Sequence, residues 1–350
     1  MIIGVVGFSW SGSSAAKDLL MEFGENCVFQ PEFPYAYYPD SISDLDFQLN
    51  ENCAKFLSSC AAIPRFRKAS KIVLDKYGKN IRKITDNYIE KITQIKWVGS
   101  VQGEEILNAN LRYKFFGKKI MINRILPKIP YGFSIKHSLY PLKEQFFSIR
   151  PDHFIEHTQS YMDDILRYLG LDMTKNIVLN QPFPGNNPLR CMKYFRDSKA
   201  IIVDRDPRDL YIAVHKLFST VSYSVPHDRI DGFIEYYRKL HENLSGALMN
   251  EDVIYIKLEE LIYEYDKTLT KIKDFLNLDN HCNKGKYFVP EMSARNTRLY
   301  LNKPDLREAI DIIEDALEEY LFPYDEYMNK FQGSIGSTDY FDENPLVEIQ

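Results

Sequence analysis

Residues 4–20 have the sequence GVVGFSWSGSSAAKDLL. An apolar run ends at Gly7, a turn rich in glycine and serine follows, and apolar residues then recur at helical spacing. We expect a buried strand, a loop and a helix in that order. The first N–H groups of a helix have no partner within it, and the helix dipole there favours an anion. The stretch therefore predicts a phosphate-binding loop at residues 7–14.

This loop differs from the ATP-binding motif GxxxxGK[ST]. Gly7 and Gly12 have the motif's spacing, but Ser13 stands where the motif has lysine. A kinase or ATPase is therefore only weakly supported. The alternative for the loop alone is a capped turn that binds no ligand.

Several other short apolar runs are rich in β-branched residues. They lie at residues 2–8, 27–29, 177–180, 200–204 and 253–257. Apolar runs without alternation are typical of parallel strands that are covered on both faces. Segments with helical periodicity lie between and after them, notably at 230–248 and 306–321. The pattern predicts an α/β fold with a central parallel sheet flanked by helices.

The segment at about 40–150 breaks this rhythm. It is basic, aromatic and mostly helical in pattern, so we expect a helical insertion that forms a lid or an acceptor-binding subdomain. Residues 55–136 contain 18 Lys and Arg against 5 Asp and Glu, in a chain of net charge -5. Either this basic segment faces an anionic partner, or its lysines lie on the solvent-exposed faces of ordinary helices. Nucleic acid is not favoured, because no nucleic-acid-binding motif accompanies the charge.

The rest of the composition describes one soluble domain. We expect residues 1–332 to form a single domain and the polar, acidic residues 333–350 to be loosely ordered. The five cysteines show no CxxC spacing, which argues against disulfides and a zinc site. The first apolar run is too short for a signal peptide or a membrane anchor, so a cytoplasmic location is expected.

A second element, AIIVDRDPRDLYIAVHK at 200–216, places two arginines after a buried strand. Arg205 and Arg208 are expected at the carboxyl edge of the sheet, where open α/β sheets bind their ligands. The alternative is that both arginines pair with the neighbouring carboxylates of the same segment.

Four segments together resemble the PAPS-dependent sulfotransferase family. They are GFSWSGSS at 7–14, VDRDPRDLYIA at 203–213, IYIKLEELIYEYDKTLTKIKDFLNL at 254–278 and YFVPEMSARNTRLY at 287–300. The resemblance covers roughly 1–35 and 175–325 and is closest to the bacterial glycan-modifying and protein-tyrosine branches. It implies a P-loop NTPase-like three-layer fold, PAPS as sulfate donor, its desulfated product PAP, and no metal.

The resemblance also implies contacts to the donor nucleotide. Ser11, Gly12, Ser13 and Ser14 match the loop that holds the 5′-phosphosulfate. Arg205 matches an arginine that binds the 3′-phosphate. The family's serine eight residues later is replaced by Ala213, and its contact is expected to be supplied by Arg208, Ser219 or Arg295.

For the chemistry, the resemblance implies a general base. Glu32 matches the position of the base in glycan and protein-tyrosine sulfotransferases, and His137 is a second candidate. Two positions that are cationic in the family are Trp10 and Gln181 here. Loss of a charged donor at a developing oxyanion costs on the order of 3 kcal/mol.

Three functions are compatible with these residues. The first is a sulfotransferase that moves a sulfuryl group from PAPS to a hydroxyl or amine of a glycan or another large acceptor. The second is a non-catalytic relative that binds a nucleotide or a sulfated glycan. The third, an atypical P-loop kinase, is the least favoured, because the motif lysine and a magnesium ligand are not found.

Overall fold

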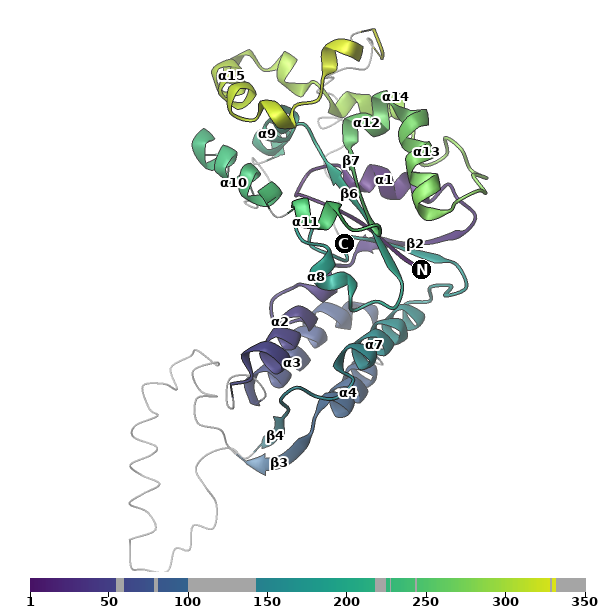
Figure 1. The fold of residues 1–350 in the computed structure, drawn as a ribbon, viewed down its shortest axis with the longest axis vertical. Helices are drawn as coiled ribbons and strands as arrows, with labels where there is room; N and C mark the ends of the chain where they lie inside the picture. Colours follow the sequence, from purple (N-terminus) through teal and green to yellow (C-terminus); the bar gives the residue numbers. More distant parts are fainter. Residues whose placement is uncertain are drawn as a thin grey trace, which may run out of the picture. The chain divides into compact units, whose positions relative to one another are not determined.

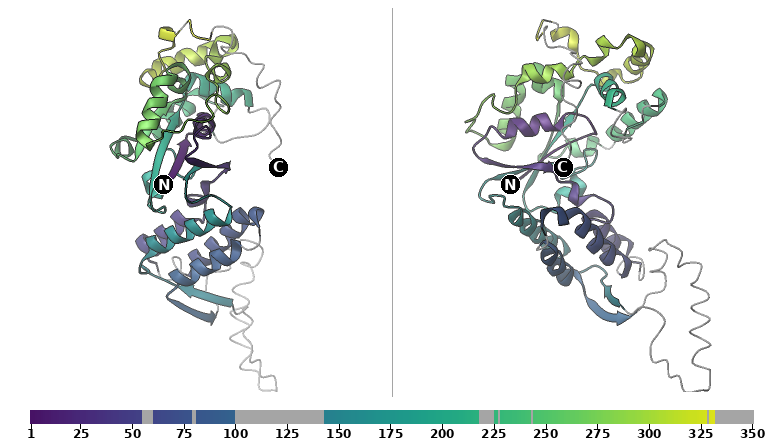
Figure 2. Two further views of the ribbon diagram at one scale, coloured as in Figure 1. Left: turned by 90° about the vertical axis from the view of Figure 1, so that its right-hand side faces the viewer. Right: turned by 180° about the vertical axis from the view of Figure 1, so that it is seen from behind.

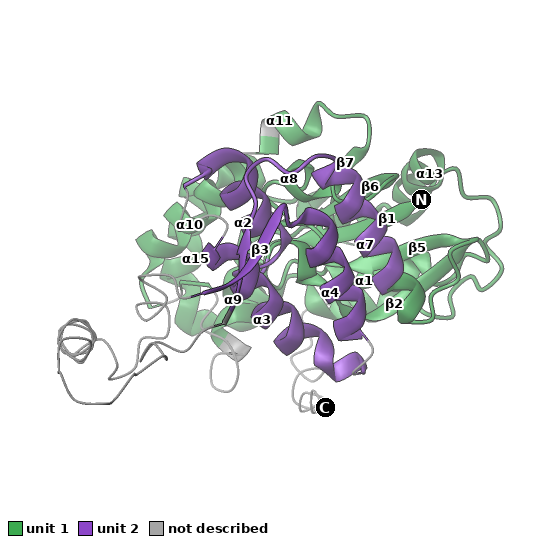
Figure 3. Ribbon diagram, turned by 90° about the horizontal axis from the view of Figure 1, so that it is seen from below, with its two compact units in different colours: residues 1–37, 166–350 green, residues 38–165 purple. Residues whose placement is uncertain are grey.

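A computed structural model describes residues 1–54, 60–78, 81–99, 143–217, 225–226, 228–242, 244–327 and 329–331. His137, Ser219, much of the basic segment and the tail from 332 onward lie outside these residues. The chain forms two compact units (Figure 3). The first contains residues 1–37 and 166–350, and the second contains residues 38–165.

The first unit is built on a parallel sheet of five strands (Figure 1). In sequence order they are β1 (Ile2–Gly7), β2 (Asn26–Glu32), β5 (Asn176–Asn180), β6 (Ser198–Asp204) and β7 (Val253–Lys257). Their spatial order is β2-β5-β1-β6-β7, and every neighbouring pair is parallel. Each apolar run of the sequence is a strand, and the predicted α/β fold is confirmed.

Helices cover the sheet on both faces. The helices of this unit are α1 (Ser13–Leu20), α8 (Leu189–Met192), α9 (Pro207–Leu217), α10 (Ile230–Glu242), α11 (Leu244–Leu248), α12 (Leu258–Tyr263), α13 (Tyr265–Leu276), α14 (Pro290–Ser293) and α15 (Arg307–Ala316). One core joins α1, α12 and α13 to the strand residues Ile3, Val5 and Ile201. The purple α1 lies against the sheet in both views of Figure 2.

Gly4 of β1 points to the opposite face, because successive strand residues alternate between faces. A Cβ at Gly4 would lie 2.4 Å from the Phe183 ring, so the segment after β5 packs directly on the backbone of β1 there. A further core joins α9, α10 and α15. The predicted helix at 230–248 is present as α10 and α11, and α10 contributes to this core.

β2 forms one edge of the sheet. Its register with β5 shifts between Val28 and Glu32. Pro31 lies within this irregular part, and an edge strand is where proline's missing N–H does not interrupt a ladder. The last pair of the register, Glu32 with Asn180, brings the two strand ends together.

The second unit contains most of the predicted insertion. Its described elements are α2 (Ile42–Asp46), a π-helical turn (Phe47–Asn52), α3 (Ala62–Leu74), α4 (Ile81–Ile92), β3 (Ile95–Gly99), β4 (Lys143–Phe147) and most of α7 (Phe154–Tyr168). Tyr88 of α4 stacks on Tyr161 of α7, and Phe66 of α3 contacts both rings edge-on. The described part is mostly helical, as predicted, but the antiparallel pair β3 and β4 was not predicted. None of the described helices has the length and apolar character needed to span a membrane.

A buried carboxylate lies at the end of β6, next to Arg205. Asp204 accepts hydrogen bonds from Tyr237 Oη at 3.0 Å, from His241 Nε2 at 3.1 Å and from the hydroxyl of Tyr255, and Lys257 Nζ lies 3.8 Å away. Burial alone would raise the pKa of Asp204, but His241 and Lys257 outweigh it and lower this pKa to about 2. The cluster holds Asp204 ionised inside the first unit.

The pKa of Asp204 makes stability depend on pH at the acid end. Because the folded pKa is below the ordinary value of 3.8, the contribution is present above about pH 4 and is lost as the pH falls toward 2. We expect this loss to be on the order of 2 kcal/mol of unfolding free energy. In urea denaturation across this range, Asp204→Asn should show a flatter acid dependence than the unmodified chain. Equal slopes for the two proteins would contradict the assignment.

Candidate functional site

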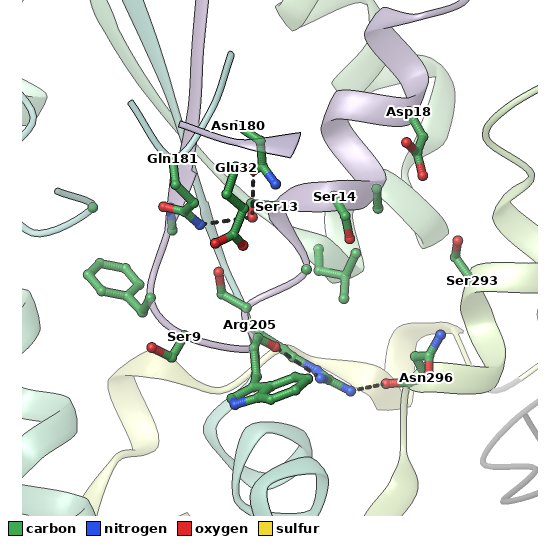
Figure 4. Close-up of a pocket in the computed structure, with 18 of the residues that line it drawn as sticks. Ser9, Ser13, Ser14, Asp18, Glu32, Asn180, Gln181, Arg205, Ser293 and Asn296 are labelled. Atoms are coloured by element: carbon green, nitrogen blue, oxygen red, sulfur yellow. Dashed lines mark hydrogen bonds between the residues drawn. The ribbon is translucent and has the colours of Figure 1, made fainter. Parts of the chain in front are cut away.

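The carboxyl ends of the parallel strands surround one pocket of about 820 Å³ (Figure 4). Each strand contributes a residue at or just beyond its end: Gly7 for β1, Glu32 for β2, Asn180 for β5, Arg205 for β6 and Leu258 for β7. This is the edge at which open parallel sheets bind their ligands. The pocket is therefore the candidate functional site of the first unit.

The loop between β1 and α1 forms the floor of this pocket. Trp10 and Gly12 both have left-handed backbone conformations, with φ of 66° and 88°. The N–H of Ser11 donates to the oxygen of Phe8 at 2.8 Å and closes the turn. α1 then begins at Ser13, so its first N–H groups, which have no partner within the helix, lie at the pocket.

Glycine is required where this loop packs tightly. A Cβ at Gly7 would lie 2.2 Å from Ser11 Oγ, and a Cβ at Gly12 would lie 2.7 Å from the Leu258 side chain. A Cβ at Gly185 would lie 2.5 Å from the backbone oxygen of Gly7. Gly7, Gly12 and Gly185 therefore let the loop, the start of α12 and the segment after β5 pack against one another.

Arg205 reaches this loop from the end of β6. Its guanidinium donates from Nη1 to the oxygen of Trp10 at 3.1 Å and from Nη2 to the oxygen of Asn296 at 2.5 Å. The side chain is buried, yet no described carboxylate lies within ion-pair distance of it. Arg205 is also the one cation among the described residues that line the pocket.

Two buried donors near the loop have no partner within the described structure. They are the hydroxyl of Ser11 and Nε of Arg205. A buried donor without a partner costs on the order of 1–3 kcal/mol. Both residues line the pocket, so an anionic ligand with several oxygens fits the hydrogen-bonding capacity that this loop leaves open.

Neutral amides at the end of β5 hold the other side of the loop. Gln181 Nε2 donates to Ser13 Oγ at 3.1 Å, and Gln181 Oε1 accepts from the N–H of Gly7 at 3.3 Å. Ser13 Oγ donates in turn to Asn180 Oδ1 at 3.4 Å. Gln181, which the resemblance places at a cationic position, thus connects β5 to both ends of the loop.

A buried glutamate fixes the opposite wall of the pocket. Glu22 follows α1, and its carboxylate accepts from the N–H groups of Gly285, Tyr287 and Phe288 at 2.9–3.1 Å, and from His281 Nε2 at 2.7 Å. Burial would raise the pKa of Glu22, but these donors together lower it. Because Tyr287 and Phe288 line the pocket, α1 positions the wall at one end and the loop at the other.

Most of the predicted site residues meet in this pocket. Its lining includes the predicted loop residues Ser11, Gly12, Ser13 and Ser14, the predicted base Glu32, and Arg205. Figure 4 shows Glu32 on the same side of the loop as Gln181 and Asn180, which agrees with the pairing of Glu32 and Asn180 across the sheet.

Three predicted residues are not found in the lining. Arg208 turns away, since it pairs with Asp206 at 2.7 Å and Glu314 at 3.0 Å and lies over the ring of Tyr300. Arg295 is not among the described lining residues, although Ser293 and Asn296 beside it are. His137 lies outside the described residues.

The segment after β6 is acidic as well as basic. Asp206 and Asp209 of this segment are fully buried, as is Glu259 of α12. Burial, together with the charge of Asp206, raises the pKa of both Asp209 and Glu259. Asp209 accepts from Tyr324 Oη at 2.5 Å and from the N–H groups of Arg298 and Leu299, so it holds the chain after α14 in place.

Several residues of the pocket were not predicted from the sequence. Asp18, Tyr236 and the residues 287–289 line it, and Glu22 positions one wall. Asp18 lies on the helix that follows the loop, and its pKa is raised by burial against the opposing charge of Lys17. No local signal identifies Glu22, because its partners lie more than 250 residues away. Among the described residues, no group of three or more His, Cys, Asp or Glu is placed to hold a metal.

Comparisons with known proteins find similar solved structures only. No protein-family model matches the chain, and no curated protein matches its sequence. The sulfotransferase domain from the curacin biosynthetic pathway is 14% identical, with 85% of this chain and 77% of that one covered and a TM-score of 0.36. The sulfotransferase domain from the Synechococcus PCC 7002 olefin synthase is 12% identical, with 92% and 95% covered and a TM-score of 0.41.

A third solved structure, sulfotransferase STF1 from Mycobacterium tuberculosis H37Rv, is 11% identical. It covers 85% of this chain and 76% of its own length, with a TM-score of 0.34.

Gly12→Ala tests the packing of the loop. The new Cβ would meet Leu258 and would also force alanine into a left-handed conformation, so we expect a loss of about 2–4 kcal/mol of unfolding free energy. Gly170→Ala is the matched control, because Gly170 has a similar φ of 81° but nothing within 4 Å of a built Cβ. We expect it to lose only about 1 kcal/mol in the same urea denaturation. Equal losses would show that Leu258 does not constrain the loop.

Proposed function

We propose that the chain is a sulfotransferase that moves a sulfuryl group from PAPS to a hydroxyl or amine of a glycan or another large acceptor. The donor nucleotide would lie in the pocket at the carboxyl edge of the sheet. The residues proposed to hold its 5′-phosphosulfate are Ser11, Gly12, Ser13 and Ser14. Arg205 is proposed for the 3′-phosphate, and Arg208 and Arg295 stay predictions for that group.

The observation that carries the proposal is the environment of Arg205. Its guanidinium is buried beside the loop, bonds two backbone oxygens, and has no carboxylate partner among the described residues. Burial raises the pKa of Asp209 and Glu259 and the charge of Arg205 acts to lower it, but neither carboxylate forms an ion pair with Arg205. A buried guanidinium with no carboxylate in contact favours a bound anion. The loop adds the N–H groups at the start of α1 and the unpartnered hydroxyl of Ser11. These groups fit a phosphate-bearing ligand.

The bound donor would supply an activated sulfuryl group. In the transfer, the acceptor oxygen or nitrogen forms a bond to sulfur, the bond from sulfur to the phosphate oxygen breaks, and PAP leaves. Glu32 is proposed to take the acceptor's proton on its carboxylate. The loop and Arg205 are proposed to stabilise the negative charge that remains on the leaving phosphate. Catalysis by this set would consist mainly of alignment and charge stabilisation.

A second candidate function rests on the neutral residues of the pocket. Trp10 and Gln181 occupy the positions at which the resemblance expects cations, and no described lining residue besides Arg205 is cationic. A relative that binds the nucleotide or a sulfated glycan without catalysis would be built in this way. The two functions share the binding site and differ in turnover, so binding and turnover must be measured separately.

Replacing Arg205 tests nucleotide binding. By calorimetry, Arg205→Ala should lower the affinity for PAP about a hundredfold, because two charge-assisted contacts to phosphate are lost. Arg205→Lys keeps the charge without the planar fork and should recover part of the affinity. Arg190→Ala removes an exposed arginine outside the pocket and should bind PAP like the unmodified chain.

This titration tests both the nucleotide site and the role of Arg205 in it. If the unmodified chain does not bind PAP at millimolar concentration, the proposed nucleotide site is wrong. If Arg205→Ala binds PAP as tightly as Arg190→Ala does, then Arg205 is not the phosphate contact. Thermal unfolding of each variant shows whether a loss of binding reflects a loss of the fold.

Replacing Glu32 tests the chemistry. Glu32→Gln removes the proposed base but keeps the shape of the side chain, so PAP affinity should stay within about twofold while transfer falls about a hundredfold or more. Transfer is measured with radiolabelled PAPS and a panel of hydroxyl-bearing and amine-bearing acceptors. Glu308→Gln, at an exposed glutamate on α15, is the control. Unchanged transfer in Glu32→Gln would eliminate Glu32 as the base, and PAP binding without transfer to any acceptor would favour the non-catalytic function.

A further inference from the structure

The second unit contains a cavity of its own. It has a volume of about 950 Å³ and lies along α3, with the segment 38–40 and the strand β4 completing its walls. This volume is within the range of small-molecule binding sites in proteins. None of the residues discussed above as part of the nucleotide pocket lines this cavity.

One part of the cavity is apolar and unusually exposed. Ile72 on α3 is 69% exposed, and Tyr38, which also lines the cavity, is 42% exposed. Val73 and Pro64 extend the apolar surface, and the buried ring of Phe146 closes it from β4. Exposed apolar side chains that gather in a concave surface mark ligand-binding grooves more often than side chains scattered singly.

The other part of the cavity carries positive charge. α3 contributes two arginines, but both are paired: Arg65 lies 2.9 Å from Asp40, and Arg67 lies 2.8 Å from Asp86 and 3.6 Å from Glu144. These pairs use both carboxylates of the described lining, Asp40 and Glu144.

Lys68 and Lys71 remain without a carboxylate partner among the described residues. They lie three residues apart on α3, so their side chains are neighbours on one surface of the helix. Ile72 lies four residues after Lys68 and is therefore its neighbour on the helix surface, and Lys71 lines the same cavity. The cavity thus offers a pair of ammonium groups directly beside an apolar surface.

We infer that this cavity binds a small amphipathic anion. The ligand is an apolar chain or ring that carries one carboxylate, sulfate or phosphate group. Its anionic group lies between Lys68 and Lys71, and its apolar body lies on Ile72 and Tyr38. The inference does not depend on the proposed sulfuryl transfer, because it rests on residues of the second unit alone.

Calorimetric titration of the full chain with decanoate tests this inference. Decanoate combines one carboxylate with a single apolar chain and should bind at one site. Decanol lacks the charge and acetate lacks the chain, so each should bind at least about tenfold more weakly. No saturable binding of decanoate, or equal binding of decanoate and decanol, would overturn the inference.

Variants locate the site. Lys68→Gln/Lys71→Gln should weaken decanoate binding about tenfold, because the counter-ions of the carboxylate are lost. Ile72→Asn should weaken it about fivefold through the apolar half, and since Ile72 is exposed this change should not disturb the fold. The control Lys76→Gln/Lys83→Gln removes the same charge from exposed lysines outside the cavity and should bind like the unmodified chain. Equal losses in the two double variants would mean that only the overall charge matters, and would overturn the inference.

Discussion

The candidate site depends on the hydrogen bonds of the Arg205 guanidinium to the backbone oxygens of Trp10 and Asn296. They join three segments that are far apart in sequence: the loop after β1, the end of β6 and the turn after α14. Because backbone oxygens carry only partial charge, they orient the guanidinium without neutralising it. The same bonds that shape the pocket therefore leave a positive charge in it, and the proposed binding of the 3′-phosphate depends on that charge.

The neighbours of Arg205 show why its charge stays available. Asp204 accepts hydrogen bonds from His241 and two tyrosine hydroxyls. Its low pKa means that it is ionised, and these groups compensate its negative charge. Asp206 is taken by Arg208, and Asp209 holds the backbone after α14. Each acidic residue of the segment thus has its own structural task. The alternative interpretation of this segment, that its arginines pair with its own carboxylates, holds for Arg208 and Asp206. Arg205 has no carboxylate within ion-pair distance among the described residues.

Much of the first unit could be predicted from the sequence because its signals are local. The apolar runs became the five strands, and Gly7 and Gly12 lie where the loop packs on Ser11 and Leu258. The parts that could not be predicted depend on contacts across the chain. Arg208 follows β6 closely but does not line the pocket, because it pairs with Asp206 in its own segment and with Glu314, more than 100 residues later. Only the second of these contacts is remote in sequence. The contact between Glu22 and the wall at Tyr287 could likewise not be predicted, because the two residues are distant in sequence.

In the second unit, the pairing of β3 with β4 spans more than 40 residues and has no local signal.

The central claim is that the pocket at the carboxyl edge of the sheet holds a phosphate-bearing nucleotide against the loop and Arg205. The most direct test is a crystal structure of the chain with PAP bound. We expect the 5′-phosphate at the N–H groups that begin α1, within hydrogen-bond distance of Ser13 or Ser14, and the 3′-phosphate in contact with Arg205. PAP bound elsewhere on the chain, or bound in this pocket without a phosphate contact to the loop or Arg205, would contradict the account.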